Sequence, residues 1–317
     1  MPPVARLCAV LVIALLIAPA GASAGWPAPP FGNVVAQDLE TAWLLPAHGA
    51  VVAFAGGLSI DYSRRLGLLA IARRQRLVVV DASGRLRWAR GISALAGAPR
   101  WSSARPVRLA VLAGHALQLV DGEGRTALRL GRARDVAPAW RPRVDQIAFV
   151  RPDGEVVVAS GGGRVLARWR PGRMPVGLSW TGNGRHLVVS LRFSVVVLDP
   201  SLRPEWSMHS PAILSAAAAP VGTRFALLTA SATATGAPVT TLELRDAARP
   251  PLHARLARAW TLGGRIVWSP DGRDVIVARP VLRDWLLITV RTHRARRLVP
   301  PRDLPADHGF ALPIAWK

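Results

Sequence analysis

The sequence predicts an all-β fold: a single β-propeller of six to seven four-stranded blades, whose closing blade is shared by strands from both ends of the chain. Three observations support this prediction. A motif led by an aromatic residue recurs about every 40 residues, each period holds about four short apolar runs bounded by turn residues, and no segment has the periodicity and caps of a long amphipathic helix. Since one four-stranded sheet cannot bury both of its faces, such repeats must stack into a ring.

The repeat is defined by a marker position that is followed by a polar turn and a β-run, as in the segment WSPDGRDVIVARP from residue 268. The six markers are Tyr62, Trp101, Trp140, Trp180, Ala219 and Trp268, at successive spacings of 39, 39, 40, 39 and 49 residues. The longer last spacing predicts a loop insertion within residues 230–238. We expect the aromatic markers to pack between blades rather than to bind a ligand.

Further β-runs keep the same phase. One run ends near an aspartate in four copies (Asp81, Asp121, Asp199 and Asp246), and an outer run carries a tryptophan in three (Trp88, Trp169 and Trp206). Each repeat therefore has an innermost strand that leads to the marker, two central strands and an outer strand. Because aspartate before glycine is typical of a tight turn between strands, Asp271 is predicted to be a turn residue and not a catalytic acid.

Both ends of the chain offer strands for one more blade. The segment FALPIAWK, residues 310–317, reads as a strand leading to Trp316 at a marker position, and residues 33–57 contain the apolar segments TAWLLP and AVVAFAGG. Pairing these strands would tie the ring shut and give seven blades. Six blades remain if residues 33–57 form an arm instead.

Residues 1–24 have the organisation of a secretory signal peptide. Arg6 supplies a basic start, residues 7–18 are apolar, and the ASA sequence at residues 22–24 is a small-residue cleavage site. The apolar run is shorter than the roughly 20 residues that span a bilayer, which favours cleavage over an uncleaved membrane anchor. We therefore expect an exported protein, periplasmic or extracellular, that is tethered to the membrane only if the signal stays attached.

The predicted division of the chain is a signal peptide at residues 1–24, an N-terminal extension at 25–40 and the propeller at 41–317. The only cysteine, Cys8, falls in the signal peptide. After cleavage the chain would have no disulfide, no thiolate metal ligand and no cysteine nucleophile.

The formal net charge is +22, from 41 basic and 19 acidic residues, and Lys317 is the only lysine. Such a charge favours binding to a polyanion or an acidic surface, although an arginine-rich composition alone can also produce it. The candidate anion or partner contacts are arginines expected in loops: Arg64, Arg65, Arg73, Arg74, Arg141, Arg143, Arg294, Arg296 and Arg297. The alternative for each of them is a solvated surface side chain.

No motif for catalysis or metal binding is found. The seven histidines include no pair two to four residues apart, and Thr181 stands where a nucleophile elbow would need its second glycine. The glycine run at residues 161–163 and the DGEG sequence at 121–124, the one compact candidate for calcium, both fall at turns between strands. We therefore predict no catalytic residue, no cofactor and no metal site, while a site assembled from loops of several blades would leave no local motif.

The element WSPDGR, residues 268–273, is similar to the repeat of TolB-type propellers, a relative of the WD repeat found widely in bacterial periplasmic proteins. Residues 180–185 (WTGNGR) match it with substitutions, and residues 140–142 (WRP) match it in part. The resemblance covers residues 50–316 and implies a propeller with an Asp-Gly turn between the first two strands of a blade. TolB proteins also carry an α/β domain before the propeller, and related peptidases carry a hydrolase domain; this sequence resembles neither.

Two functions are consistent with these features. The first is a non-catalytic binding scaffold for a protein or an anionic cell-envelope partner. The second is a hydrolase or lyase that acts on a sugar, lactone or peptide-derived substrate in the central channel, which would require convergent carboxylates or histidines there. Nucleic acid is not expected as a partner, because an exported protein seldom meets it, and we expect a monomer.

Overall fold

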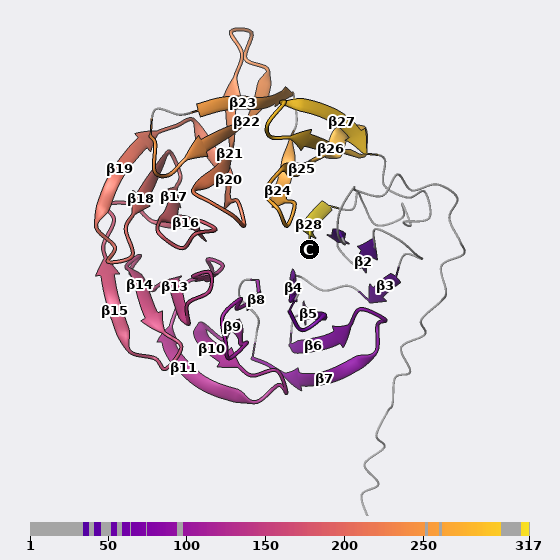
Figure 1. The fold of residues 1–317 in the computed structure, drawn as a ribbon, viewed down its shortest axis with the longest axis vertical. Helices are drawn as coiled ribbons and strands as arrows, with labels where there is room; N and C mark the ends of the chain where they lie inside the picture. The colour runs from indigo at the N-terminus through magenta and orange to yellow at the C-terminus, as the bar shows by residue number, and fades with distance from the viewer. Residues whose placement is uncertain are drawn as a thin grey trace, which may run out of the picture.

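The computed structural model describes residues 34–37, 41–45, 52–55, 59–63, 65–73, 75–93, 98–250, 253–259, 262–298 and 312–316, the first three and the last of these as backbone only. The predicted signal peptide lies outside these residues, as do Arg64 and Arg74. Within them the chain forms seven four-stranded antiparallel sheets, arranged as a ring around a central axis (Figure 1). The prediction of an all-β propeller is confirmed.

Six of the sheets each come from one continuous stretch of chain, and their strand order follows the sequence. Blade 1 has β4 (Ser59–Ser63), β5 (Leu68–Arg73), β6 (Arg76–Asp81) and β7 (Leu86–Gly91); blade 2 has β8 (Arg100–Trp101), β9 (Leu109–Ala113), β10 (Ala116–Val120) and β11 (Thr126–Arg132); blade 3 has β12 (Ala139–Trp140), β13 (Gln146–Val150), β14 (Val156–Ser160) and β15 (Val165–Trp169). Blade 4 has β16 (Pro175–Trp180), β17 (Leu187–Leu191), β18 (Ser194–Leu198) and β19 (Pro204–His209); blade 5 has β20 (Ala212–Ala218), β21 (Arg224–Ala232), β22 (Pro238–Asp246) and β23 (His253–Ala259); blade 6 has β24 (Gly263–Trp268), β25 (Asp274–Arg279), β26 (Asp284–Thr289) and β27 (Arg294–Leu298). In each blade the first strand is the innermost one (Figure 1).

The seventh sheet joins the two ends of the chain. It contains β28 (Leu312–Trp316), β1 (Val34–Gln37), β2 (Thr41–Leu45) and β3 (Val52–Ala55), in that order. β28 pairs antiparallel with β1, contacts β24 on one side and β4 on the other, and lies near the axis of the ring (Figure 1). The split closing blade is therefore confirmed, and the sheet begins before the propeller boundary predicted at residue 41, because β1 supplies the strand that receives β28.

Five of the six markers end or directly follow the innermost strands, Tyr62 is the penultimate residue of β4, and all six are buried. Trp180 packs with Val156 and Val158 of the preceding blade and with Leu187 of its own. Trp268 and Trp101 lie in equivalent clusters that each draw on two neighbouring blades. Since a stacked sheet needs large apolar side chains at its contact faces, the predicted packing role of the aromatic markers is confirmed.

Tryptophans that recur in the repeat also form hydrogen bonds between neighbouring blades. The Trp140 Nε1–H donates to the Arg100 carbonyl of the preceding blade at 2.9 Å. In the outer strands, the Trp88 Nε1–H donates to the Gly122 carbonyl of the next blade at 2.9 Å. A buried indole N–H needs an acceptor, so these bonds allow tryptophan to fill the gaps between blades.

The aspartates close turns as predicted. Asp121 Oδ1 accepts the backbone N–H groups of Glu123 and Arg125, both at 2.9 Å, and Asp271 Oδ1 accepts the Arg273 N–H at 3.0 Å. The glycine run also forms a turn, in which Gly163 adopts a positive φ of 88° that suits a residue without a Cβ. These residues are explained by chain reversal, and Asp271 is confirmed as a turn residue.

The additional residues of the fifth repeat form a longer hairpin and not the loop that the sequence predicted. The prediction was a loop over residues 230–238, but β21 and β22 are nine residues long and stay paired as far as Ala232 and Pro238. The turn itself covers residues 233–237 and is closed by the Gly236 N–H on the Thr233 carbonyl at 2.9 Å. The added residues therefore lengthen a hairpin that projects beyond the outline of the ring (Figure 1), since a run of Ala, Ser and Thr can continue a strand.

Candidate functional site

Two hollows in the described part of the ring concentrate positive charge. The first is the central channel, which has a volume of about 650 Å³ and is lined by the innermost strands of blades 1 to 6. The second, here called the rim pocket, has a volume of about 230 Å³ and lies between blades 5 and 6. The sequence did not predict that the residues lining these hollows come together, because the candidate contacts were expected in loops.

The channel wall combines apolar side chains with polar groups in similar measure. Val176, Leu178 and Ile213 line it beside small residues of β20, and four marker tryptophans, Trp101, Trp140, Trp180 and Trp268, also reach it. Its charged residues among those described are Asp61 in β4, Arg100 in β8 and Arg265 in β24. The channel therefore combines apolar side chains with one charged sector, an arrangement common in sites for small ligands.

The charged sector is held together by Asp61. Its Oδ2 accepts the Trp101 backbone N–H at 2.7 Å, and its Oδ1 lies 3.8 Å from Arg100 Nη1. Burial, followed by the charge of Arg100, lowers the pKa of Arg265 from its ordinary value to about 10, against a smaller opposing effect of Asp61. One carboxylate thus faces two guanidinium groups, and the sector carries a net charge of +1.

The described channel lining offers charged and polar groups that can bind a ligand. Among the described lining residues there is one carboxylate and no histidine, so the paired acid and base that a hydrolase or lyase would use are not brought together. In the part of the chain that the structure covers, no group of three or more His, Cys, Asp or Glu residues could hold a metal ion.

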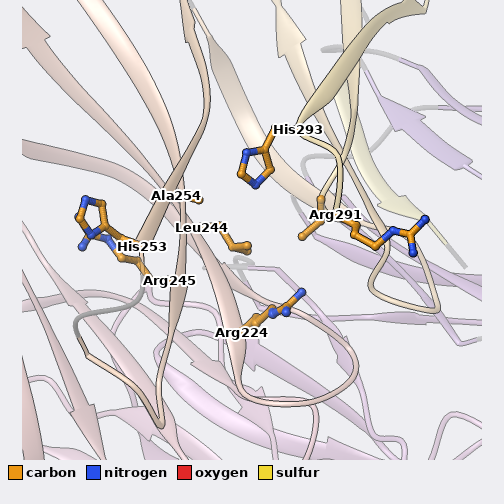
Figure 2. A pocket seen from close by; sticks show the side chains of 8 residues that line it. Arg224, Leu244, Arg245, His253, Ala254, Arg291 and His293 are labelled. Atoms are coloured by element: carbon orange, nitrogen blue, oxygen red, sulfur yellow. The ribbon is translucent and has the colours of Figure 1, made fainter.

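The rim pocket is lined by five basic side chains around a small apolar floor. These residues are Arg224, Leu244, Arg245, His253, Ala254, Val290, Arg291 and His293. In Figure 2, Arg291 and His293 from blade 6 lie across the pocket from His253 and Arg245 of blade 5, and Arg224 lies below them. The pocket follows from the stacking of two adjacent blades, each of which brings basic residues to the same edge.

The electrostatics of the rim pocket are one-sided. None of its eight lining residues is acidic. Glu243 binds Arg245 through the Arg245 Nε–H at 3.1 Å, whereas Arg224, Arg291 and His293 are exposed to solvent. Exposed cations such as Arg224 and Arg291 attract anions, and the bidentate geometry of arginine suits carboxylate, phosphate and sulfate groups.

Three of the predicted arginines join the first turns of neighbouring blades. The Arg65 Nη1–H donates to the Ser103 carbonyl at 3.3 Å, and the Arg143 backbone N–H donates to Ser103 Oγ at the same distance. The Arg141 Nε–H donates to the Gly184 carbonyl at 2.8 Å. Arg65, Arg141 and Arg143 thus lie on one face of the ring.

Arg141 has a structural role. Its guanidinium lies 5.3 Å from the centre of the Trp180 ring, and burial lowers its pKa below the ordinary value. A partly desolvated cation over an indole ring stabilises the fold, and the bond to the Gly184 carbonyl ties it to blade 4. The geometry therefore assigns Arg141 to the contact between blades 3 and 4.

The remaining predicted arginines lie elsewhere. Arg73 ends β5 and is half-buried, whereas Arg294, Arg296 and Arg297 are exposed on the outer strand β27. Arg297 also pairs with Asp284, which binds Arg279 as well. The structure does not bring the predicted set together, but β27 begins directly after His293 and so continues the positive charge of the rim pocket.

The comparisons with known proteins support the fold. No protein-family model matches the chain, and no curated protein matches it in sequence. A chain in the crystal structure of the mitotic checkpoint complex superposes with a TM-score of 0.63 at 15% identity, over 92% of this chain and 95% of that chain. The Cps50 (Swd1) β-propeller domain of Myceliophteria thermophila gives 0.61 at 15% identity, over 84% and 90%.

A third solved structure is similar. The Pan2 WD40 domain of Neurospora crassa gives a TM-score of 0.60 at 10% identity, over 76% of this chain and 78% of that chain. At these identities the similarity shows the fold alone. The chain therefore has the architecture of a β-propeller.

Proposed function

We propose that the protein is an exported propeller that acts as a non-catalytic binding scaffold for an anionic partner of the cell envelope, an acidic polymer or lipid. The observation that carries the proposal is the rim pocket, where five basic side chains converge and no lining residue is acidic. The exposed arginines of β27 extend this charge along the edge of blade 6. A protein partner with an acidic surface is the second candidate, favoured by the use of WD40 propellers in protein complexes.

The proposed compartment depends on two features of the sequence. Residues 1–24 have the organisation of a signal peptide, and the WSPDGR motif resembles the repeat of TolB-type propellers, which are widespread in the periplasm. Among the described residues, no helix is long and apolar enough to cross a membrane. Fusion of residues 1–30 to a reporter that is active only after export tests the compartment separately from binding.

Binding is tested with the full chain and lipid vesicles. Vesicles containing phosphatidylglycerol should sediment the protein, and vesicles of phosphatidylcholine alone should not. The double substitution Arg224→Gln and Arg291→Gln removes two exposed cations of the rim pocket and should weaken binding about tenfold, since each contact is a charge-assisted hydrogen bond.

The matched control is Arg168→Gln with Arg203→Gln, which removes the same charge from exposed positions on blades 3 and 4. This variant should bind nearly as well as the parent chain. Equal weakening in both double variants would mean that net charge alone causes the attraction, and the rim pocket would lose its assigned role. Binding of an acidic envelope protein without vesicle binding would select the second candidate.

A further inference from the structure

The channel contains a cation that its surroundings do not neutralise. Arg265 is half-buried, and across the described residues it has no hydrogen bond or ion pair of its own. The adjacent strand β28 has the sequence LPIAW and so contains no acidic residue. Among the described residues, the carboxylate near Arg265 is Asp61, which already accepts the Trp101 N–H and faces Arg100.

Such a cation is costly for the fold. Charged groups that leave water are normally paired, because desolvation disfavours the charged form. Here the charges of Arg265 and Arg100 also repel each other, and the pKa of Arg265 falls to about 10. An anion placed between the two guanidinium groups would remove both penalties at once.

The remaining residues that line the channel indicate the chemistry of the other end of such a ligand. Val176, Leu178 and Ile213 line the same cavity, whose volume of about 650 Å³ lies within the range typical of small-molecule sites. The charged sector has a net charge of +1. The attraction of an anion to it rises linearly with the anion's charge, whereas the cost of desolvating the anion rises with the square of that charge, so a singly charged head group suits this sector better than a doubly charged one.

We propose that the central channel binds a small monocarboxylate, with its head group on Arg265 and Arg100 and its apolar body against the wall of blades 4 and 5. Asp61 lies beside Arg100, competes with the ligand for its charge and lowers the affinity for dianions. This site is distinct from the rim pocket and does not depend on the function proposed for it.

The test uses the full chain and three eight-carbon probes: octanoate, octyl phosphate and octanol, titrated by calorimetry at pH 7. Octanoate should bind saturably, octyl phosphate more weakly, and octanol most weakly. Arg265→Gln should weaken octanoate binding about tenfold to a hundredfold, the effect of losing a hydrogen bond to a charged group. Arg203→Gln, an exposed change of the same charge, and the rim-pocket double variant should leave it unchanged.

Asp61→Asn should change the octanoate affinity in the opposite direction to Arg265→Gln. Asparagine keeps an oxygen for the Trp101 N–H, but removes the charge that competes with the ligand, so octanoate should bind several-fold more tightly. This variant carries the test if Arg265→Gln does not fold. The proposal is overturned if the parent chain does not bind octanoate, if octanol binds as tightly, if Arg265→Gln binds with the parent affinity, or if Asp61→Asn binds less tightly.

Discussion

The central channel and the rim pocket are both positively charged hollows, but the ring builds them in different ways. The charged residues of the channel come from blades 1, 2 and 6, at positions 61, 100 and 265 of the sequence. The rim pocket needs only blades 5 and 6, which are consecutive in the chain. The channel site therefore exists only in a closed ring, whereas the rim pocket needs only two adjacent blades.

The two hollows also differ in their contact with water. Arg265 is half-buried near a single carboxylate, and its pKa is lowered. Arg224, Arg291 and His293 of the rim pocket are exposed, without an acidic residue in the lining. Interactions in the channel are thus weakly screened and specific in geometry, whereas those of the rim pocket depend on salt.

Removing β28 should separate the two hollows most clearly. Truncation after Arg302 deletes the strand that pairs with β1 and lies between β24 and β4. We expect the melting temperature to fall by on the order of 10 °C, and octanoate binding to be lost, because Arg265 and Asp61 are no longer held across the closing blade. Calorimetric melting of the two chains measures the first effect.

The rim pocket is the internal control for this truncation. At a temperature where the shortened chain is still folded, its binding to anionic vesicles should change less than its binding to octanoate. An unchanged melting temperature would show that closure by β28 does not stabilise the ring, and an unchanged octanoate affinity would show that the channel site does not require closure.

Replacing Arg265 with methionine should stabilise the protein. At neutral pH the arginine is charged in both the folded and unfolded chain, and the fold bears its desolvation; removing it should raise the free energy of unfolding by about 1–3 kcal/mol. Arg224→Met in the rim pocket should change it by less than about 0.5 kcal/mol, since that side chain is exposed. Denaturant unfolding of both variants makes the comparison.

The pH dependence of the free energy of unfolding also tests this prediction, because its direction can be derived from the pKa of Arg265. Arg265 has a pKa of about 10 in the fold, below its ordinary value in the unfolded chain. Between these values the unfolded chain binds more protons, so the stability of the parent chain relative to Arg265→Met should rise with pH. A lower stability of Arg265→Met at pH 7 would mean that Arg265 makes a favourable contact and would remove the physical basis of the channel site.

Salt should affect the two hollows unequally. Raising the ionic strength to about 1 M shortens the screening length to about 3 Å. Vesicle binding through the rim pocket should then be nearly abolished, while octanoate binding in the channel should fall by only a few-fold. Parallel salt dependences for the two ligands would show that both bind through exposed charges.

Much of the fold could be predicted because each blade repeats the same physical solution. Trp180 and Trp268 mark the contact between sheets, and turn aspartates such as Asp121 mark the chain reversals. The closing blade could be predicted because the apolar segments at both ends had no partner of their own. The lengthened hairpin of blade 5 was expected as a loop, because Ala, Ser and Thr can occupy either a loop or a strand.

The sites were harder to predict. Arg100 and Arg265 precede the markers Trp101 and Trp268 by one and three residues, so the repeat register could have placed them on innermost strands. Their proximity could not be predicted, since it depends on how many blades close the ring. Among the loop arginines, Arg141 joins two blades, and the charge that converges at the rim includes strand residues such as Arg245.

The smallest effect is expected at a turn that belongs to neither hollow. Burial raises the pKa of Asp121, but hydrogen bonds from Arg125 and Glu123 outweigh it and hold the pKa below the ordinary value of 3.8. The stabilisation is therefore present above pH 3.8 and is lost as the pH falls through the lower folded value. Asp121→Asn keeps the turn without titrating, so its cost should stay below about 0.5 kcal/mol at pH 7 and shrink towards pH 3. Urea unfolding across this range measures the difference. Because neither cationic hollow includes Asp121, octanoate and vesicle binding should stay at parent values; a change in either would mean that the turns on this face of the ring are coupled to that hollow.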